Sequence, residues 1–158
     1  MSTIAAISTP RAAGGISVIR ISGENALSVA DEIFSPLSSN VPPSEMQGYT
    51  CAYGKIMNGG TAVDDGVLTV FRAPKSYTGE DVAEISCHGG IFLTEQVLRL
   101  VLSKGAVPAE AGEFTKRAFL NRKMSLTQAE AVMDVISAGE RRSFGVLPHF
   151  GRVRCFAG

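Results

Sequence analysis

The fold class of this chain follows from one segment, Val82-Ala83-Glu84-Ile85-Ser86-Cys87-His88-Gly89-Gly90. Residues 82–87 predict a strand, and the glycine pair opens a helix that we expect to run from about Ile91 to Lys104, with Gly105 after its end. This helix is apolar over most of its surface, so we expect it to lie against a sheet. Its apolar residues include Leu93, Val97, Leu98, Leu100, Val101 and Leu102.

Alternation along this strand gives it one polar and one apolar face. Glu84, Ser86 and His88 point one way together with Val82, and the residues between them point the other way. A carboxylate, a hydroxyl and an imidazole in a row need either solvent or polar partners, because burying an unpaired charge is costly. The pattern therefore leaves two readings open: a solvent-exposed face or a polar site.

Two strands and a helix are predicted upstream of this segment. The strands cover residues 4–8 and 16–21, which are rich in β-branched residues. Ser22 or Gly23 is expected to cap a helix that ends before Ser35-Pro36. The loop between the strands contains Gly14-Gly15, which, like Gly89-Gly90, would allow the backbone to approach another group closely. The second pair could also offer free N–H groups to an anion or a polar ring.

The middle of the chain predicts more strands and loops. Residues 35–47 read as an irregular loop, because they contain three prolines and four serines. Strands are expected at residues 49–56 and 66–71, with Asn58-Gly59-Gly60 as the turn between them. Strands mixed with helices of this length predict an α+β fold or an open α/β sandwich, in which roughly five strands form one layer covered by helices. We favour the α+β fold with a mixed β-sheet.

Arg20 lies among aliphatic residues in the predicted strand 16–21. Alternation places it on one face with Ile16 and Val18, whereas Ile19 and Ile21 point to the opposite layer. A guanidinium in this setting could form a structural ion pair, with Glu84 as one candidate partner. It could instead hold a ligand carboxylate through two parallel hydrogen bonds.

A joint between two helices is predicted within residues 113–131. Ser125 and Gln128 have the spacing of a capping box, so the second helix is expected to begin near Leu126. In the first helix, Phe114 and Ala118 share one side with Asn121. Four cations give the joint a basic surface, and such groups usually form a solvated face. They are Lys116, Arg117, Arg122 and Lys123.

Composition and missing motifs limit the possible functions. Fifteen basic and fifteen acidic residues give a net charge of zero, so any contact with RNA would need a local patch. The sequence contains no G-x-x-x-x-G-K-[ST] or G-x-G-x-x-G phosphate cradle and no G-x-S-x-G elbow, which argues against GTP hydrolysis by this chain and against a Ser-His-Asp hydrolase. No metal site is expected from its Cys and His spacing.

The expected compartment is the cytoplasm. The three cysteines Cys51, Cys87 and Cys155 are far apart and are expected to be buried free thiols in a reducing cytosol. No apolar run reaches the roughly 18 residues needed to cross a bilayer, and no secretory leader is recognised, so no membrane association is expected. Residues 139–158 depart from the helical pattern before them, with glycines and Pro148, and suggest a truncated or frame-shifted end or a disordered tail.

Three segments together resemble the amino-terminal part of the MnmE (TrmE) family of tRNA modification GTPases. They run from Thr9-Pro10-Arg11 to Gly23, from Ser76-Tyr77-Thr78-Gly79-Glu80 to Gly90, and from Glu113-Phe114-Thr115-Lys116-Arg117 to Ala131. The resemblance covers about residues 3–138. It implies a folate-binding and dimerisation domain over residues 1–122, similar to half of the glycine cleavage T-protein fold. Residues 123–138 would then begin a central helical domain, and residues 139–158 would be an off-pattern tail.

The same resemblance implies a cofactor, 5-formyltetrahydrofolate or a related tetrahydrofolate, near a dimer interface. The family's folate contacts fall on Arg20, Glu84 and Lys123, and no catalytic residue is expected. Glu84 could accept hydrogen bonds from the amino-pyrimidine edge of a pterin. Arg20 and Lys123 could hold a carboxylate or a carbonyl oxygen.

The expected partners are a second copy of the chain and, for the full-length family, the flavoprotein MnmG and tRNA. The family adds an aminomethyl or carboxymethylaminomethyl group to the wobble uridine. Its potassium- and magnesium-dependent GTP hydrolysis would require a GTPase domain outside this chain, so we expect folate binding without GTP hydrolysis. Two other hypotheses remain: a dimerisation module in which Arg20 and Glu84 form only a structural pair, and an RNA-binding module that uses the four cations of the joint.

Overall fold

The glycine pair at residues 89–90 joins a strand to a helix, as the sequence predicts. A computed structural model of the chain describes residues 1–37 and 39–138. In this structure β6 (Val82–His88) leads through Gly90, the N-cap, into α2 (Ile91–Ser103). Gly105 follows the helix with a φ of +103°, in the left-handed region that favours glycine. The helix lies against β1, β2 and β6, which confirms its predicted position.

Seven strands form a single mixed sheet in the order β3-β4-β5-β6-β2-β1-β7. The neighbours are antiparallel except for the parallel pair β1–β7, and the α+β fold class is confirmed. The other bounds are β1 (Ile4–Ile7), β2 (Ile16–Ser22), β3 (Phe34–Pro36), β4 (Thr50–Asn58), β5 (Thr61–Phe71) and β7 (Val107–Pro108).

The sheet has more strands than the roughly five that were expected. β3 contains 3 residues and pairs with β4 at one edge of the sheet. β7 contains 2 residues and pairs with β1 at the other edge. Both strands form because of this pairing. β5 starts five residues earlier than expected, because the polar segment from Thr61 pairs with the end of β4 across a turn at Gly59 (φ +59°). Loop 35–47 also holds a short 3₁₀ helix, η1 (Pro43–Glu45).

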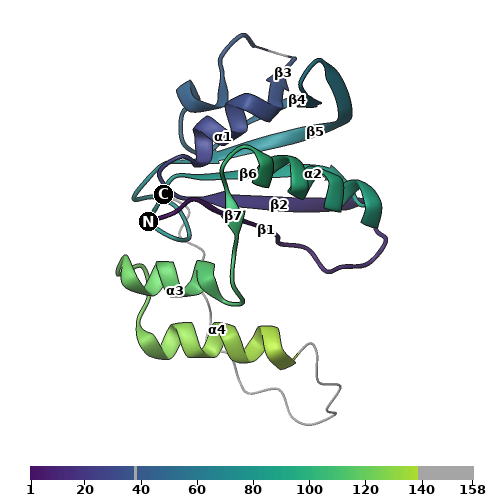
Figure 1. Cartoon of the computed structure of the whole chain (residues 1–158). Coiled ribbons are helices and arrows are strands. Elements are labelled where there is room, and N and C mark those ends of the chain that lie inside the picture. Colours follow the sequence, from purple (N-terminus) through teal and green to yellow (C-terminus); the bar gives the residue numbers. More distant parts are fainter. Residues whose placement is uncertain (38, 139–158) are drawn as a thin grey trace.

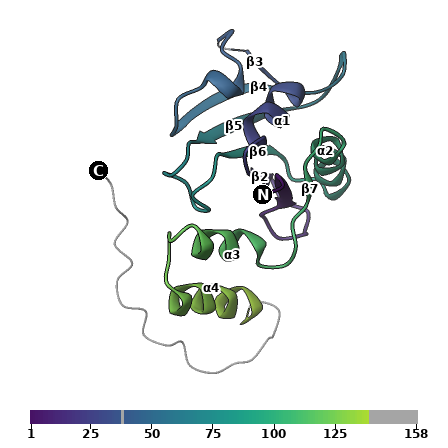
Figure 2. The same ribbon diagram turned by 60° about the vertical axis from the view of Figure 1, so that its left-hand side comes forward.

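Two helices cover one face of the sheet and enclose the core. α1 (Ala26–Ile33) and α2 lie on the same side of the strands (Figures 1 and 2). The expected cap at Ser22 or Gly23 is wrong, because Ser22 stays in β2 and Asn25 occupies the N-cap of α1. The core contains residues of both layers, among them Ile19, Ile21, Ile33, Leu68, Ile85, Val97 and Val101.

The predicted helical joint is present at the edge of the molecule. α3 (Glu113–Leu120) lies between the sheet and α4 (Leu126–Ala138) (Figures 1 and 2). The capping box at the start of α4 is confirmed: the Ser125 N–H donates to Gln128 Oε1 at 2.8 Å, and the Gln128 N–H donates to Ser125 Oγ at 3.2 Å. The break between the helices is therefore fixed by side-chain hydrogen bonds.

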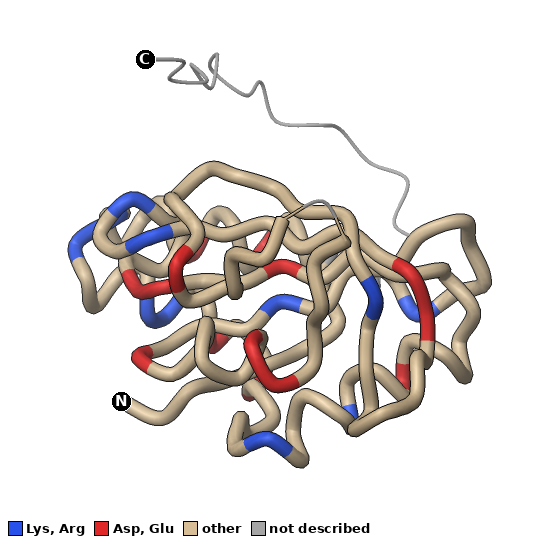
Figure 3. The backbone as a smooth tube through the Cα atoms, turned by 90° about the horizontal axis from the view of Figure 1, so that it is seen from above, with Lys and Arg blue, Asp and Glu red and all other residues tan. Residues whose placement is uncertain are grey.

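Charged residues are distributed over the whole described part of the chain. Figure 3 shows basic and acidic positions interspersed, in keeping with the net charge of zero. Within residues 1–37 and 39–138, no helix is both long and apolar enough to cross a membrane. The tail predicted for residues 139–158, with Cys155, lies outside the described residues.

Candidate functional site

Arg20 and Glu84 are direct cross-strand neighbours on the open face of the sheet. The antiparallel register of β2 and β6 sets them opposite each other. Arg20 Nε donates to Glu84 Oε1 at 2.7 Å, and the two side chains are 27% and 24% exposed. The neighbouring Ile19 and Ile85 are fully buried on the opposite face, as alternation predicts. The structure thus brings together two of the three predicted site residues in the ion pair that the sequence left open.

This pair keeps unused hydrogen-bonding groups. Within the described part of the chain, the bond between Nε and Oε1 is the only hydrogen bond of either side chain. The guanidinium has five N–H donors and the carboxylate has two oxygens, so the Nη groups and Oε2 are left for solvent or a ligand. The pair can therefore offer donors and an acceptor side by side.

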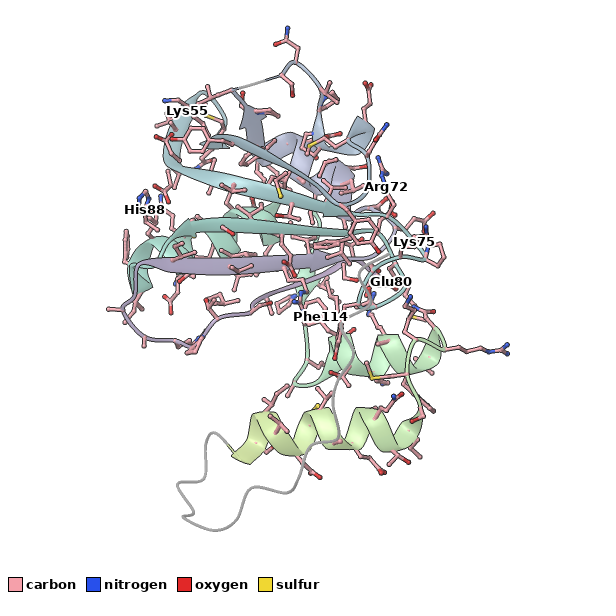
Figure 4. The ribbon with its side chains drawn as sticks, turned by 180° about the vertical axis from the view of Figure 1, so that it is seen from behind. Lys55, Arg72, Lys75, Glu80, His88 and Phe114 are labelled. Carbon is pink, nitrogen blue, oxygen red and sulfur yellow. The ribbon has the colours of Figure 1, made fainter. Side chains whose placement is uncertain are left out.

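Two aromatic rings lie against the Arg20 guanidinium. Arg20 Cζ is 5.5 Å from the centre of the Tyr77 ring and 5.6 Å from that of Phe114, within cation–π range. Tyr77 belongs to the loop 72–81 and Phe114 to the first turn of α3, and the Tyr77 hydroxyl lies 3.0 Å from Thr115 Oγ1. Figure 4 shows Phe114 beside the sheet at its α3 end. Flat apolar surfaces thus flank the charged pair.

A buried ionic cluster fixes α3 to the loop beneath these rings. Arg117 is 3% exposed, and its Nη1 donates to both carboxylate oxygens of Glu80 at 3.1 Å. Its Nη2 donates to Glu113 Oε1 at 2.9 Å, and Ser22 Oγ donates to Glu80 Oε2 at 2.8 Å. The expectation that Arg117 belongs to a solvated basic surface is therefore wrong, because two carboxylates hold its guanidinium inside the protein.

The same cluster sets the charge state of Glu113. Burial favours the neutral acid, but the Glu110 N–H and the Arg117 guanidinium outweigh it, so the pKa of Glu113 is below its usual value. Glu113 accepts from that N–H at 2.8 Å. The carboxylate therefore remains ionised and keeps Arg117 paired.

Short polar contacts fix the loop that carries Tyr77. Thr78 Oγ1 lies 2.7 Å from Ser22 Oγ on β2, and Asn121 Nδ2 donates to the Thr78 carbonyl at 2.7 Å from the end of α3. Gly79 has a φ of +79°, and a Cβ there would lie 3.0 Å from Asn121 Cβ, so glycine is needed for the turn. Tyr77 is thus held from both sides.

Lys123 lies in the same region, but among the described residues it forms no hydrogen bond or ion pair with Arg20 or Glu84. Its Nζ donates to the Pro74 carbonyl at 2.9 Å. It lines an open pocket of about 310 Å³ together with Tyr77, which also packs on Arg20. The third predicted residue is therefore connected to the other two through the Tyr77 ring.

His88, at the other end of the polar row on β6, has its own partner. His88 Nδ1 lies 2.8 Å from Asp64 Oδ1, and the His88 N–H donates to Oδ2 at 2.9 Å. Burial acts to raise the pKa of Asp64, but these bonds to His88 outweigh it and the pKa is lowered. Figure 4 shows His88 at the opposite end of the sheet from Phe114. The polar row therefore divides, and only Glu84 joins the candidate site.

The two glycine pairs contact each other. The Gly14 N–H donates to the Gly89 carbonyl at 3.1 Å, and the Gly89 N–H donates to the Gly15 carbonyl at 3.2 Å. A side chain on Gly89 would collide with the Gly14 carbonyl. The close approach inferred from these glycines is therefore one of backbone to backbone.

The cysteines do not share one environment. Cys87 is buried, and burial with the nearby negative charge of Asp64 raises the pKa of its thiol to about 11. Cys51 is exposed on β4, so the expectation of a buried thiol is wrong at this position. Its side chain lies on the solvent side of the alternating strand.

Several residues around the pair were not singled out as site residues from the sequence. The i,i+4 spacing of Glu113 and Arg117 is a signal that could have predicted their ion pair. Glu80 and Tyr77 gave no comparable signal, because their partners lie 37 and 38 residues away in Arg117 and Thr115. Long-range contacts of this kind become visible only in the folded chain.

Comparisons with known proteins agree with the resemblance in sequence. Residues 3–123 match the family model described as GTP-binding protein TrmE N-terminus. The chain is 53% identical over 138 residues to the tRNA modification GTPase MnmE of Carboxydothermus hydrogenoformans, covering 86% of this chain and 30% of that protein. It is 53% identical over 146 residues to the MnmE of Lactiplantibacillus plantarum, covering 91% and 31%. For the MnmE of Listeria innocua, the identity is 51% over 144 residues. The chain thus spans less than a third of the length of these relatives.

Proposed function

This chain belongs to the family of TrmE amino-terminal domains, and we propose that it is the tetrahydrofolate-binding, dimerising module of a tRNA modification GTPase. The name tRNA modification GTPase belongs to the relatives as whole proteins. This chain spans only 30% to 31% of their length. Action in the cytoplasm on the wobble uridine of tRNA, together with MnmG, is part of the same proposal. Potassium- and magnesium-dependent GTP hydrolysis would belong to a GTPase domain outside these residues.

The observation that carries the proposal is the Arg20–Glu84 pair on the open sheet face. It combines free guanidinium N–H groups with a free carboxylate oxygen, and the rings of Tyr77 and Phe114 flank the guanidinium. Because both side chains are about a quarter exposed, a ligand can replace solvent at these free groups. The arrangement suits a flat heterocycle that has hydrogen-bond donors and acceptors along one edge.

A reduced pterin has such an edge. Its amino-pyrimidine N–H groups would donate to Glu84, and its carbonyl oxygen would accept from Arg20. Lys123, on the far side of Tyr77, would meet the carboxylate end of the same ligand. When bound, the tetrahydrofolate would supply a one-carbon unit, while the residues of this chain bind and orient it.

The test is a calorimetric titration of the full chain with 5-formyltetrahydrofolate. We expect Arg20→Ala and Glu84→Ala to weaken binding at least about tenfold, the effect of losing one charge-assisted contact. Arg99→Ala and Glu95→Ala on α2 are matched controls, because this helix covers the opposite face of the sheet, and they should bind as the wild type does.

Equal affinity of the wild type, Arg20→Ala and Glu84→Ala would defeat the proposed site and favour the dimerisation module with a structural pair. The RNA-binding alternative predicts salt-sensitive tRNA affinity that depends on the cations of the joint. One of those cations, Arg117, is buried between Glu80 and Glu113 and cannot contribute to a surface patch.

A further inference from the structure

A pocket with two lysines shares Tyr77 with the surroundings of the Arg20–Glu84 pair. It has a volume of about 310 Å³, and Lys75 and Lys123 both line it. This volume is at the lower end of the roughly 300–1,000 Å³ of small-molecule sites, which suits one part of a longer ligand. The remaining lining residues are Tyr49, Phe71, Ser76 and Tyr77.

The pocket is positively charged. Among the residues that the structure describes, no acidic residue lines it. Within residues 1–37 and 39–138, neither Lys75 nor Lys123 has a carboxylate oxygen within 4.0 Å, whereas Lys55 and Lys104 are paired with Asp65 and Glu32. In the part of the chain that the structure describes, the one side-chain hydrogen bond of the two pocket lysines joins Lys123 Nζ to the Pro74 carbonyl. Two ammonium groups without carboxylate partners favour an anionic ligand.

The aromatic wall of the pocket contains an unusual backbone conformation. The Tyr49 side chain is 64% exposed, and its backbone φ is +64°. Residues other than glycine rarely adopt this left-handed conformation. Its ring meets Phe71 edge to face at 5.8 Å. Residues held in such conformations concentrate at ligand-binding positions. The wall thus presents an exposed ring next to the two cations.

Tyr77 connects this pocket to the Arg20–Glu84 pair. Its ring lines the pocket and also lies 5.5 Å from Arg20 Cζ. One elongated ligand can therefore pass from the pair, along Tyr77, to the lysines. Figure 4 shows Lys75 and Glu80 at the same end of the sheet, far from Lys55 and His88.

We infer that this pocket binds the oligo-γ-glutamyl tail of a folate and that Lys75 recognises the carboxylates beyond the first glutamate. The inference rests on the proposed function, which places the pterin at Arg20 and Glu84. Each added γ-glutamyl residue contributes one more carboxylate, and a lysine ammonium binds a carboxylate without demanding a fixed geometry. The open pocket leaves the rest of the tail in solvent.

The test compares 5-formyltetrahydrofolate carrying one or three glutamates, titrated against the full chain. We expect the triglutamate to bind the wild type about tenfold more tightly, the contribution of one added ion pair at a partly exposed site. Lys75→Gln should keep the monoglutamate affinity and reduce this advantage to about twofold or less. Lys55→Gln, at the opposite end of the sheet, should keep the full advantage. The advantage of the wild type should also fall at high salt.

The outcomes separate this inference from the proposed function. Binding of both folates with equal affinity, or an advantage that persists in Lys75→Gln, overturns the tail subsite and leaves the folate proposal intact. Absence of binding for both folates removes the proposed function and the subsite with it. A short oligouridylate that binds in a Lys75-dependent manner, with no effect of tail length, would identify an RNA contact and overturn the inference.

Discussion

Arg117 holds together the parts of the chain that form the candidate site. Its guanidinium pairs with Glu80 in the loop that carries Tyr77 and with Glu113 in α3, which carries Phe114. Ser22 on β2 joins the same cluster through Glu80. The positions of both aromatic rings relative to Arg20 therefore depend on a residue whose side-chain hydrogen bonds, among the described residues, all go to Glu80 and Glu113.

Replacing Arg117 by methionine should destabilise the fold strongly. The variant keeps much of the side-chain volume but leaves the partly buried carboxylates of Glu80 and Glu113 without their shared cation, which costs about 3 kcal/mol. Urea denaturation of Arg117→Met against the exposed neighbour variant Lys116→Met measures this cost. The control should change the free energy of unfolding by about 0.5 kcal/mol or less. Similar midpoints for both variants would show that the cluster contributes little.

Glu113 should contribute to acid sensitivity. Its pKa in the folded state lies below the usual 4.5, because the Glu110 N–H and Arg117 outweigh the effect of burial. A lowered pKa stabilises the folded state above the unfolded-state value, and this contribution is lost as the pH falls through the folded-state value. The stability difference between the wild type and Glu113→Gln should therefore shrink between about pH 6 and about pH 3.

Denaturation curves at several pH values measure this difference. Glu130→Gln, exposed on α4, is the control and should stay close to the wild type throughout. A difference between the wild type and Glu113→Gln that is constant with pH would contradict the assigned role of the Glu113 carboxylate.

Side-chain direction could be predicted from sequence, whereas a long-range partner could at most be proposed as one of several candidates. Alternation on two strands correctly placed Arg20 and Glu84 opposite the buried faces of Ile19 and Ile85, because the period of a strand fixes direction. Their pairing required the register of β2 and β6, which depends on the whole sheet. For Arg117, the local cluster of basic residues predicted an exposed side chain. The side chain is buried instead, because it forms a long-range ion pair with Glu80.

Among the elements, α4 depends most on its own capping. The helix begins at Leu126, and its first turn is closed by the reciprocal bonds of Ser125 and Gln128. Ala129 is its one residue classed as buried between Leu126 and Ser137. A helix with so little buried surface gains little from packing, so local hydrogen bonds matter more.

Ser125→Ala should therefore loosen α4 without affecting the sheet. Loss of a serine cap costs about 1 kcal/mol, which raises local opening about fivefold. Amide hydrogen exchange should become faster in the first turns of α4 and stay unchanged in α2. Thr127→Ala, which changes an exposed hydroxyl inside the helix, is the matched control. Unchanged exchange in Ser125→Ala would mean that contacts with α3 alone hold the helix.

Long elements with strong patterns were predictable, and edge strands were not. The apolar periodicity of α2 and the capping box of α4 are local signals that the fold preserves. β3 ends in Pro36 and β7 ends in Pro108. Proline usually indicates a loop, because it has no N–H to donate to a neighbouring strand. These strands form because each pairs by hydrogen bonds with a neighbouring strand. The local sequence does not show this pairing.

In the molecule as a whole, the open face of the sheet connects the candidate site to an apolar surface. One register row runs Cys51, Thr69, Glu84, Arg20 and Ala6 across five strands, and the next row runs Tyr53, Val67, Ser86 and Val18. Tyr53 is 53% exposed and Ile16 is 67% exposed, and both line a pocket of about 190 Å³. Exposed apolar patches of this kind mark interaction surfaces. A second copy seated here would lie next to the Arg20–Glu84 pair.

Tyr53→Glu should therefore weaken the proposed homodimer. A buried interfacial aromatic contributes about 2 kcal/mol or more, so a charge in its place should raise the dimer Kd at least about 30-fold. Ile91→Glu is a matched control, since Ile91 is also 53% exposed but lies at the start of α2, which covers the other face. Sedimentation velocity over a range of concentrations distinguishes the variants. A wild-type chain that stays monomeric would contradict the proposed homodimer. Equal effects of both substitutions would place self-association elsewhere and separate it from the folate site.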